Sequence, residues 1–330
     1  MTPILVTGGA GYIGSSTCKA LYRCGYLPVT VDNLVYGHRW AVKWGPLEEA
    51  DIADTNKIQA LFEKYRPEAV IHFAAFAYVG ESVQDPRKYY LNNVAGTLNL
   101  LSVMKNCGCD KIIFSSTCAT YGNPERIPID ETHRQVPVNP YGRSKLMIEQ
   151  ILQDFGSAYG MRHVILRYFN ASGADPEGQI GESHDPETHL IPLAIKAVLE
   201  GKSVQVYGKD YDTPDGTAIR DYIHVSDLAE AHCLSLKYLL AGNKSDCFNL
   251  GTGRGYSVLE IIEAVERVSG KKVRYDITDR RPGDPDKLIA SSAKANEKLG
   301  WRCRYMELEP VIETAYRWHA EQIKDKRSDL

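Results

Sequence analysis

The chain has 330 residues, 43% of them hydrophobic and 25% charged, and its formal net charge is −3. This size and composition indicate a globular protein with a large core, and without a basic excess we expect no nucleic-acid partner. No apolar run approaches the roughly 18 residues of a membrane span, so we expect no membrane partner. The first residues do not have the pattern of an export signal, so we expect a cytoplasmic protein.

Short apolar runs alternate with helical patterns over the first half of the chain. In chain order they predict strands at residues 3–7, 27–32, 47–52, 68–74, 111–116 and 163–169, and helices at 12–24, 55–65, 96–106 and 144–159. The strands are continuously apolar, as in a parallel sheet covered by helices on both faces. The alternation therefore predicts an α/β fold with a doubly wound parallel sheet of the Rossmann type.

The regular alternation ends near Gly173, where loop-rich segments begin to mix with helical patterns at 190–200, 226–240, 257–269 and 306–322. We therefore expect a Rossmann domain over residues 1–172 and a smaller, mixed α/β lobe over residues 173–330. The apolar run before Gly251 predicts that the chain returns to the first domain near residues 226–250.

Three glycines follow the first predicted strand and lead directly into a helix. Gly8, Gly11 and Gly14 have the spacing that permits a tight turn, close approach to a pyrophosphate and close packing of helix on strand. The N-terminus of the helix adds free N–H groups and a partial positive charge. Asp32 ends the second strand, where a carboxylate accepts hydrogen bonds from ribose hydroxyls and repels a 2′-phosphate. The pattern predicts a dinucleotide site that prefers NAD over NADP.

A tyrosine and a lysine stand four residues apart behind an Asn-Pro pair, in the stretch NPYGRSK. Pro140 suits the start of a helix, so Tyr141 and Lys145 share one face of its first turns. An ammonium near a phenol lowers the pKa of the phenol, which can then take a proton from an alcohol while NAD takes the hydride. Just upstream, three hydroxyls end another strand in the run SST, and one of them can bond the reacting oxygen.

The motifs TGGAGYIG, DNL, HFAA, SST, YGRSK and RYFN occur in an order that resembles the extended short-chain dehydrogenases. With GTAIRDYIHVSDLAEAH and RRPGDP added, the chain is similar almost end to end to the UDP-glucose 4-epimerase family of nucleotide-sugar epimerases. The resemblance implies bound NAD, a UDP-sugar substrate and a homodimer. It also implies that the first domain binds NAD and that the second lobe binds the UDP-sugar.

The same resemblance implies the residues of the site. Its catalytic residues would be Tyr141 as the base, Lys145 as the cofactor anchor and Thr117 as the hydroxyl partner. Its cofactor-binding residues would be Gly8, Gly11, Tyr12, Ile13, Gly14, Asp32, Asn33, Leu34, Asp51, Ile52, Phe73, Ala74, Ala75, Asn92, Ser115, Tyr141, Lys145 and Tyr168. Its substrate-binding residues would be Thr117, Tyr141, Asn170, His189, Leu190, Tyr207, Arg220, Tyr222, Arg281 and Asp284. The two arginines suit a buried diphosphate, because a guanidinium is cationic and donates several hydrogen bonds.

Three positions depart from the family pattern or narrow it. Ala77 stands where the family often has a lysine, which puts one cofactor phosphate contact in doubt. His189 stands where an asparagine usually precedes Leu190, which puts its substrate contact in doubt. Leu288 fills the position that limits room for a 2-acetamido group, so we expect a preference for non-acetylated sugars.

The stretch HDPETH imitates a metal site with His184, Asp185, Glu187 and His189. A short mixed cluster lacks a geometric signature, so we interpret it as a polar loop and expect no metal. The eight cysteines are scattered without a CxxC pair, which is typical of reduced thiols.

The expected reaction is inversion at C4 of a UDP-hexose, UDP-glucose or UDP-galactose, through a transient 4-keto sugar with the hydride held on tightly bound NAD. The UDP-pentoses, xylose and arabinose, remain open as substrates. The nearest rival is an NAD-dependent nucleotide-sugar dehydratase or decarboxylase, but those enzymes carry an acidic residue just after the Ser/Thr, where this chain has Cys118 and Ala119. A non-catalytic NAD-sensing protein on this fold would not need Tyr141, Lys145 and Thr117 together.

Overall fold

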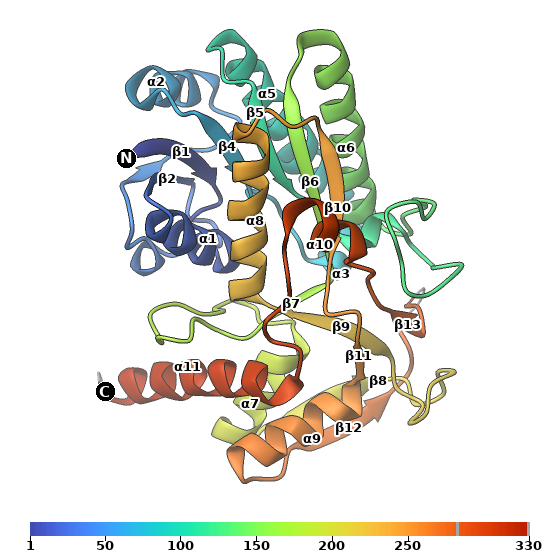
Figure 1. Ribbon diagram of the computed structural model, residues 1–330. Coiled ribbons are helices and arrows are strands. Elements are labelled where there is room, and N and C mark those ends of the chain that lie inside the picture. Colours follow the sequence, from blue (N-terminus) through green and yellow to red (C-terminus); the bar gives the residue numbers. More distant parts are fainter. Residues whose placement is uncertain (282–283, 329–330) are drawn as a thin grey trace.

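A seven-stranded parallel sheet, in the order β10-β6-β5-β4-β1-β2-β3, forms the frame of the larger lobe (Figure 1). The computed structural model describes residues 1–281 and 284–328, with side chains described as far as residue 324. The strands are β1 (Thr2–Thr7), β2 (Tyr26–Asp32), β3 (Leu47–Glu49), β4 (Ala69–His72), β5 (Lys111–Ser115), β6 (Arg162–Tyr168) and β10 (Asp246–Leu250). The strand order reverses between β1 and β4, which is where open α/β sheets bind their ligands.

Helices cover both faces of this sheet, as its continuously apolar strands require. Alternate residues of β1 point to opposite faces, so Ile4 and Val6 join one core cluster while Leu5 joins the other. The first face is covered by α1 (Tyr12–Arg23) and α8 (Val225–Leu240), and the second by α2 (Thr55–Tyr65), α5 (Gly96–Asn106) and α6 (Pro140–Tyr159).

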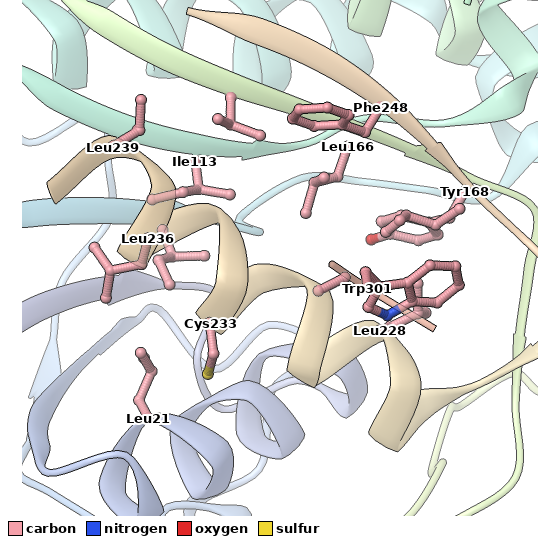
Figure 2. Packing of buried hydrophobic residues seen from close by; sticks show 14 of the residues in the cluster. Leu21, Ile113, Leu166, Tyr168, Leu228, Cys233, Leu236, Leu239, Phe248 and Trp301 are labelled. Atoms are coloured by element: carbon pink, nitrogen blue, oxygen red, sulfur yellow. The ribbon is translucent and has the colours of Figure 1, made fainter. Parts of the chain in front are cut away.

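Figure 2 shows the core on the first face, where α8 packs against both the sheet and α1. Leu236 of α8 and Phe248 of β10 are fully buried, and so is Leu21 of α1. Burying a side chain of this size stabilises the fold by about 1.5–3 kcal/mol. Phe248 also lies beside Leu166 in the register of β10 with β6, so residues 225–250 complete the sheet and its helical cover.

The smaller lobe lies at the opposite end of the molecule from α2 and α5 (Figure 1). Its mixed sheet is built around β9 (Ile219–His224), which pairs with β7 (Asn170–Ser172), β11 (Gly255–Ser257) and β13 (Lys287–Leu288). A second pair is formed by β8 (Ser203–Tyr207) and β12 (Arg274–Thr278). The helices α7 (Leu190–Glu200), α9 (Val258–Ser269) and α11 (Leu308–Ser328) share one apolar core with these strands.

Three short helical elements between β4 and α5 were not predicted. They are α3 (Val79–Gln84), α4 (Pro86–Tyr89) and the π-helix η2 (Tyr90–Ala95). Each is too short to show an amphipathic period, and Pro86 interrupts the segment. The remaining elements are η1 (Arg39–Ala41), η3 (Cys118–Thr120) and α10 (Ala293–Leu299).

The predicted α/β fold with a doubly wound parallel sheet is confirmed. The domain boundary at residue 172 stays a prediction, and Pro282 and Gly283 of the RRPGDP motif lie outside the described residues. Over residues 1–281 and 284–328, no helix combines the length and the apolar character needed to cross a bilayer.

A buried ion pair joins α6 to β6. Arg167 Nη2 lies 2.6 Å from Glu149 Oε2, and the two side chains are only 5% and 1% exposed. Glu149 also accepts hydrogen bonds from Ser116 and Gln135. Because burying a charge without a partner is expensive, this pair matters more for stability than a surface pair of the same length.

We expect Arg167→Met to lower the free energy of unfolding by about 3–5 kcal/mol, because it leaves the Glu149 carboxylate buried without its cation. Urea denaturation followed by circular dichroism measures the change. The matched control is Arg126→Met, which breaks the exposed Arg126–Asp130 pair and should cost less than about 1 kcal/mol. Equal losses in the two variants would contradict the role given to burial.

Candidate active site

The carboxyl ends of the parallel strands meet at one edge of the large sheet, and the predicted cofactor residues follow those ends. Gly8 follows β1, Asp32 ends β2 and Phe73 follows β4. Ser115 ends β5 and Tyr168 ends β6, where their hydroxyls are hydrogen-bonded to each other. The edge therefore brings together residues that are more than 150 positions apart in the chain.

The glycine turn between β1 and α1 fits a dinucleotide pyrophosphate. Gly8 has a φ of +70°, and a Cβ there would lie 2.6 Å from the backbone nitrogen of Ala74. A Cβ on Gly14 would lie 2.2 Å from Gly8 O, so α1 packs against the turn as closely as the spacing predicts. Gly11 is the N-cap of α1, where a Cβ would meet only Gly8 O among the described residues, at 3.4 Å. The side of Gly11 that faces away from Gly8 O is open. An anion can therefore bind there, at the free N–H groups of α1.

A second polar group lies at the end of β2. The Asp32 carboxylate is 8% exposed and accepts hydrogen bonds from the backbone nitrogens of Ala10, at 3.0 Å, and Leu34, at 2.8 Å. Burial raises the pKa of Asp32, and these two bonds oppose the rise. Asn33 donates to Asp51 at 2.8 Å. These residues provide two carboxylates and no cation. They therefore suit the ribose hydroxyls of NAD and disfavour the additional 2′-phosphate of NADP.

The start of α6 places Tyr141 as the NPYGRSK stretch predicts. Asn139 caps the helix by accepting from the backbone nitrogen of Gly142, at 2.8 Å, and Pro140 is its first residue. A Cβ on Gly142 would lie 2.5 Å from Ala119 O, so α6 begins in close contact with η3. This contact brings Tyr141 near Thr117, which is the N-cap residue of η3.

Tyr141 is half-buried at the start of α6. Burial raises its pKa well above the usual value near 10, the neighbouring Tyr168 adds to the rise, and Thr117 lowers it in part. Without a further positive charge, Tyr141 therefore holds its proton at neutral pH.

Lys145 lies one turn further along α6 and is 3% exposed. Its ammonium donates to Ser115 O at 2.8 Å and lies 4.8 Å from the centre of the Phe114 ring. Burial lowers the pKa of Lys145 to about 7, against the attraction of Glu149. The ammonium is thus held against the end of β5, and its stabilisation of a Tyr141 phenolate stays a prediction.

Asn93 is a buried polar residue beside the candidate site that was not predicted from the sequence. It is fully buried, donates to Phe76 O at 3.0 Å and Ser144 Oγ at 3.1 Å, and accepts from the Phe76 nitrogen at 2.9 Å. It therefore ties the segment after β4 to α6, next to Tyr141. The signal was present in the doublet Asn92–Asn93, within a π-helix of a kind that often occurs at functional sites. Asn92, the predicted cofactor residue, donates to the side chain of Asn93.

The predicted UDP-sugar residues come mostly from the smaller lobe. Arg220 of β9 forms an ion pair with Asp284, at 2.5 Å. The Arg281 guanidinium lies over the Tyr207 ring, 4.1 Å from its centre. Leu288 lies beside Arg220 in the register of β13 with β9.

The other predicted substrate residues are placed by β7, β9 and α7. Asn170 lies beside Tyr222 in the register of β7 with β9, and Tyr222 is buried in the core of the smaller lobe. Leu190 begins α7, and the side chain of His189 faces Glu182 and Glu187. Ala77 is exposed, and the missing cofactor phosphate contact at this position stays a prediction.

Comparison with known proteins identifies the family. The sequence model of the NAD dependent epimerase/dehydratase family matches residues 4–251. A curated relative from Rhizobium meliloti, named UDP-glucose 4-epimerase, is 52% identical over 97% of each chain. The crystal structure of UDP-glucose 4-epimerase from Brucella ovis in complex with NAD has a TM-score of 0.94 and 53% identity, covering 96% of this chain and 98% of that one.

A solved structure of lower sequence identity contains a UDP-sugar as well as NAD. UDP-glucose-4-epimerase from Stenotrophomonas maltophila, with bound NAD and formylated UDP-arabinopyranose, has a TM-score of 0.95 and 38% identity, covering 98% of this chain and 100% of that one. The family match, the sequence identity over nearly the whole length and the shared fold all indicate the same family. The chain therefore belongs to the NAD dependent epimerase/dehydratase family and, within it, to the UDP-glucose 4-epimerases.

Proposed function

We propose that this protein interconverts UDP-glucose and UDP-galactose by inverting C4 of the sugar through a transient 4-keto intermediate. The observation that carries the proposal is the close contact between the start of α6, which bears Tyr141, and η3, whose N-cap residue is Thr117. They lie at the end of β5, on the same sheet edge as the glycine turn, in a chain that belongs to the UDP-glucose 4-epimerases. The protein is then an isomerase of carbohydrate metabolism, in the interconversion of galactose and glucose.

NAD is the cofactor that the site fits. Gly8, Gly11 and Gly14 leave room for its pyrophosphate at the N-terminus of α1, and Asp32 with Asp51 provides acceptors for its ribose hydroxyls. When bound, NAD supplies a hydride acceptor and, in its oxidised form, a positive charge. The chain itself must hold the sugar and move the proton of the C4 hydroxyl.

Tyr141 is the base in this proposal, and Thr117 holds the reacting oxygen. Because burial raises the pKa of Tyr141, a cation is needed to stabilise its phenolate. Lys145 provides one close to the site, since its own pKa of about 7 leaves it partly charged at neutral pH. Tyr141 takes the O4 proton as the ketone forms and returns it when the ketone is reduced on the opposite face, so no net oxidation occurs.

The uridine diphosphate is the fixed part of the substrate, and the sugar must be free to turn. Arg220 and Arg281 supply the positive charge that a diphosphate needs in a cleft, and Tyr207 offers an exposed aromatic face for the uracil ring. Asn170, Leu190, Tyr222 and Asp284 are the remaining residues proposed for the substrate side, whereas the His189 side chain faces Glu182 and Glu187.

A UDP-pentose is the second candidate substrate, because the Stenotrophomonas maltophila enzyme was crystallised with a formylated UDP-arabinopyranose. Elimination of the kind that dehydratases perform is disfavoured. The residue after Thr117 is Cys118, and burial raises the pKa of its thiol to about 12, so it is a poor proton donor.

We also propose that the protein works as a homodimer in the cytoplasm. All eight cysteines are free thiols, which suits a reducing compartment, and fractionation of the host cell tests the location. The neighbouring helices α5 and α6 expose large apolar side chains, among them Leu98 at 43% and Met147 at 41%. Apolar side chains gathered on one surface are typical of an interface.

The purified protein should convert UDP-galactose to UDP-glucose without added cofactor, and deuterium at C4 should be retained in the product, since the hydride never reaches solvent. Tyr141→Phe should keep the bound NAD but reduce turnover by about 10²–10⁴-fold, because the base is lost while the ring still packs. A coupled assay measures the rate, and mass spectrometry measures the retained label.

The matched control for this prediction is Tyr159→Phe, at the exposed end of the same helix, which should behave as the unchanged protein. Turnover at the unchanged rate in Tyr141→Phe would remove Tyr141 from the mechanism. Loss of the C4 label to solvent in the unchanged protein would remove the proposed route altogether.

Leu288→Ser should allow the protein to epimerise UDP-N-acetylgalactosamine. The Leu288 side chain is packed with the cluster around Cys118 and Phe169, next to Thr117, and a smaller residue opens space there for the acetamido group. Initial rates with the acetylated and plain sugars measure the change in preference. Leu288→Ile, which keeps the volume, should leave the preference as it is; an active Leu288→Ser protein with the original preference would be evidence against this position.

The double variant Leu98→Glu/Met147→Glu should convert the dimer to a monomer, because two carboxylates would be buried in the proposed interface. Analytical ultracentrifugation measures the mass. The control is Ile277→Glu, an exposed position on β12 of the smaller lobe, which should remain dimeric. A single-chain mass for the unchanged protein, or a dimeric double variant, would exclude the α5–α6 interface.

A further inference from the structure

The segment between β7 and α7 brings four metal-binding side chains to one point. Glu182, His184, Glu187 and His189 each contribute one ligand atom, and the four atoms lie within 4.8 Å of one another. His189 Nδ1 lies 2.8 Å from Glu182 Oε1 and 3.0 Å from Glu187 Oε1. His184 Nδ1 lies 3.1 Å and 3.8 Å from the same two oxygens. Two nitrogens and two oxygens thus lie close enough together to bind one ion.

The two carboxylates of this cluster are buried, although they carry the same charge. The Glu182 side chain is 6% exposed and the Glu187 side chain 4%. Glu187 Oε2 is buried without a hydrogen bond in the described part of the chain, and the Lys196 ammonium approaches it only to 3.9 Å. Bringing two negative groups together away from water is costly, so the arrangement requires a positive charge between them.

Among the described residues, His184 leaves one ring nitrogen free to bind an ion, whereas His189 Nδ1 is hydrogen-bonded to Glu187 Oε1 at 3.0 Å. Although His184 Nδ1 lies 3.1 Å from Glu182 Oε1, it is buried and makes no hydrogen bond within the described residues. A buried ring nitrogen without a hydrogen bond can offer its lone pair to an ion held by the two glutamates.

We propose that Glu182, His184, Glu187 and His189 form a binding site for one divalent transition-metal ion, with zinc as its best match. Zinc favours imidazole nitrogen and carboxylate oxygen in tetrahedral sites. With zinc bonds of about 2.0–2.1 Å, neighbouring ligand atoms are separated by about 3.3–3.4 Å. The four nitrogen–oxygen distances, from 2.8 to 3.8 Å, bracket that value.

The position of the cluster indicates a structural role. The Trp318 indole of α11 donates a hydrogen bond to Glu182 O at 3.0 Å. His38 Nε2 is hydrogen-bonded to Ser183 O at 2.9 Å. His189 is the N-cap residue of α7, and burial together with the charges of both glutamates raises the pKa of Tyr12 at the start of α1. With four protein ligands the site has no open position for chemistry. The ion would stabilise the position of the 182–189 segment between the smaller lobe and the glycine turn.

Titration with cobalt and zinc tests the site in the full-length protein, without a polyhistidine tag and with its bound NAD, after treatment with a chelator. We expect one Co²⁺ per chain, with the intense visible absorption of four-coordinate cobalt and without the near-ultraviolet band of a cobalt–thiolate bond. Zinc should displace the cobalt and raise the midpoint of thermal unfolding. Glu187→Gln and His184→Gln should each weaken cobalt binding by at least about tenfold.

The matched control is Asp185→Asn, which lies in the same segment but outside the four-residue cluster and should bind cobalt as the unchanged protein does. Failure of the unchanged protein to bind one equivalent of cobalt or zinc would overturn the proposal. So would four-coordinate binding that survives both Glu187→Gln and His184→Gln, because the ion would then lie elsewhere. Should either variant fail to fold, the stoichiometry and spectrum of the unchanged protein decide by themselves.

Discussion

The common direction of the seven strands is the constraint on which the site depends. Because every strand of the large sheet is parallel to its neighbours, the turns that follow β1, β2, β4, β5 and β6 all open at one edge. Glycines at the first of these turns leave space for a phosphate, while hydroxyls and a lysine gather at the ends of β5 and β6. A reversal of any central strand would remove its residue from the group.

Burial then determines how these residues behave chemically. The same enclosure that raises the pKa of Tyr141 lowers the pKa of Lys145 to about 7, so both groups are driven toward their neutral forms. A phenol and an amine in such surroundings respond strongly to any charge placed beside them. The arrival of a charged ligand is therefore able to change the protonation of the site, which a solvent-exposed pair could not do.

The sequence was most informative where chemistry depends on local spacing. The glycine triplet, the capped start of α6 and the strands with two covered faces could all be predicted, because each rests on residues close together in the chain. The short helices α3 and α4 and the π-helix η2 could not, since they have no period long enough to detect. Asn93 was missed for a related reason: only the folded chain distinguishes it from Asn92.

The 182–189 segment also shows what could not be predicted from sequence spacing, here the exact members of a side-chain cluster. The sequence pattern grouped His184, Asp185, Glu187 and His189, whereas the fold turns Asp185 away and brings in Glu182. Spacing alone cannot tell which side chains of a loop converge, because that depends on the elements it packs against, here Trp318 of α11.

The return of the chain through α8 and β10 has a consequence for synthesis. A nascent chain that has emerged only as far as β6 lacks α8, one of the two helices that cover the first face of its sheet, and β10, which pairs with the outer edge of β6. Its apolar face and an open strand edge remain uncovered until residue 250 has left the ribosome. Both lobes must therefore mature together, late in translation, with much of the smaller lobe already available to fold.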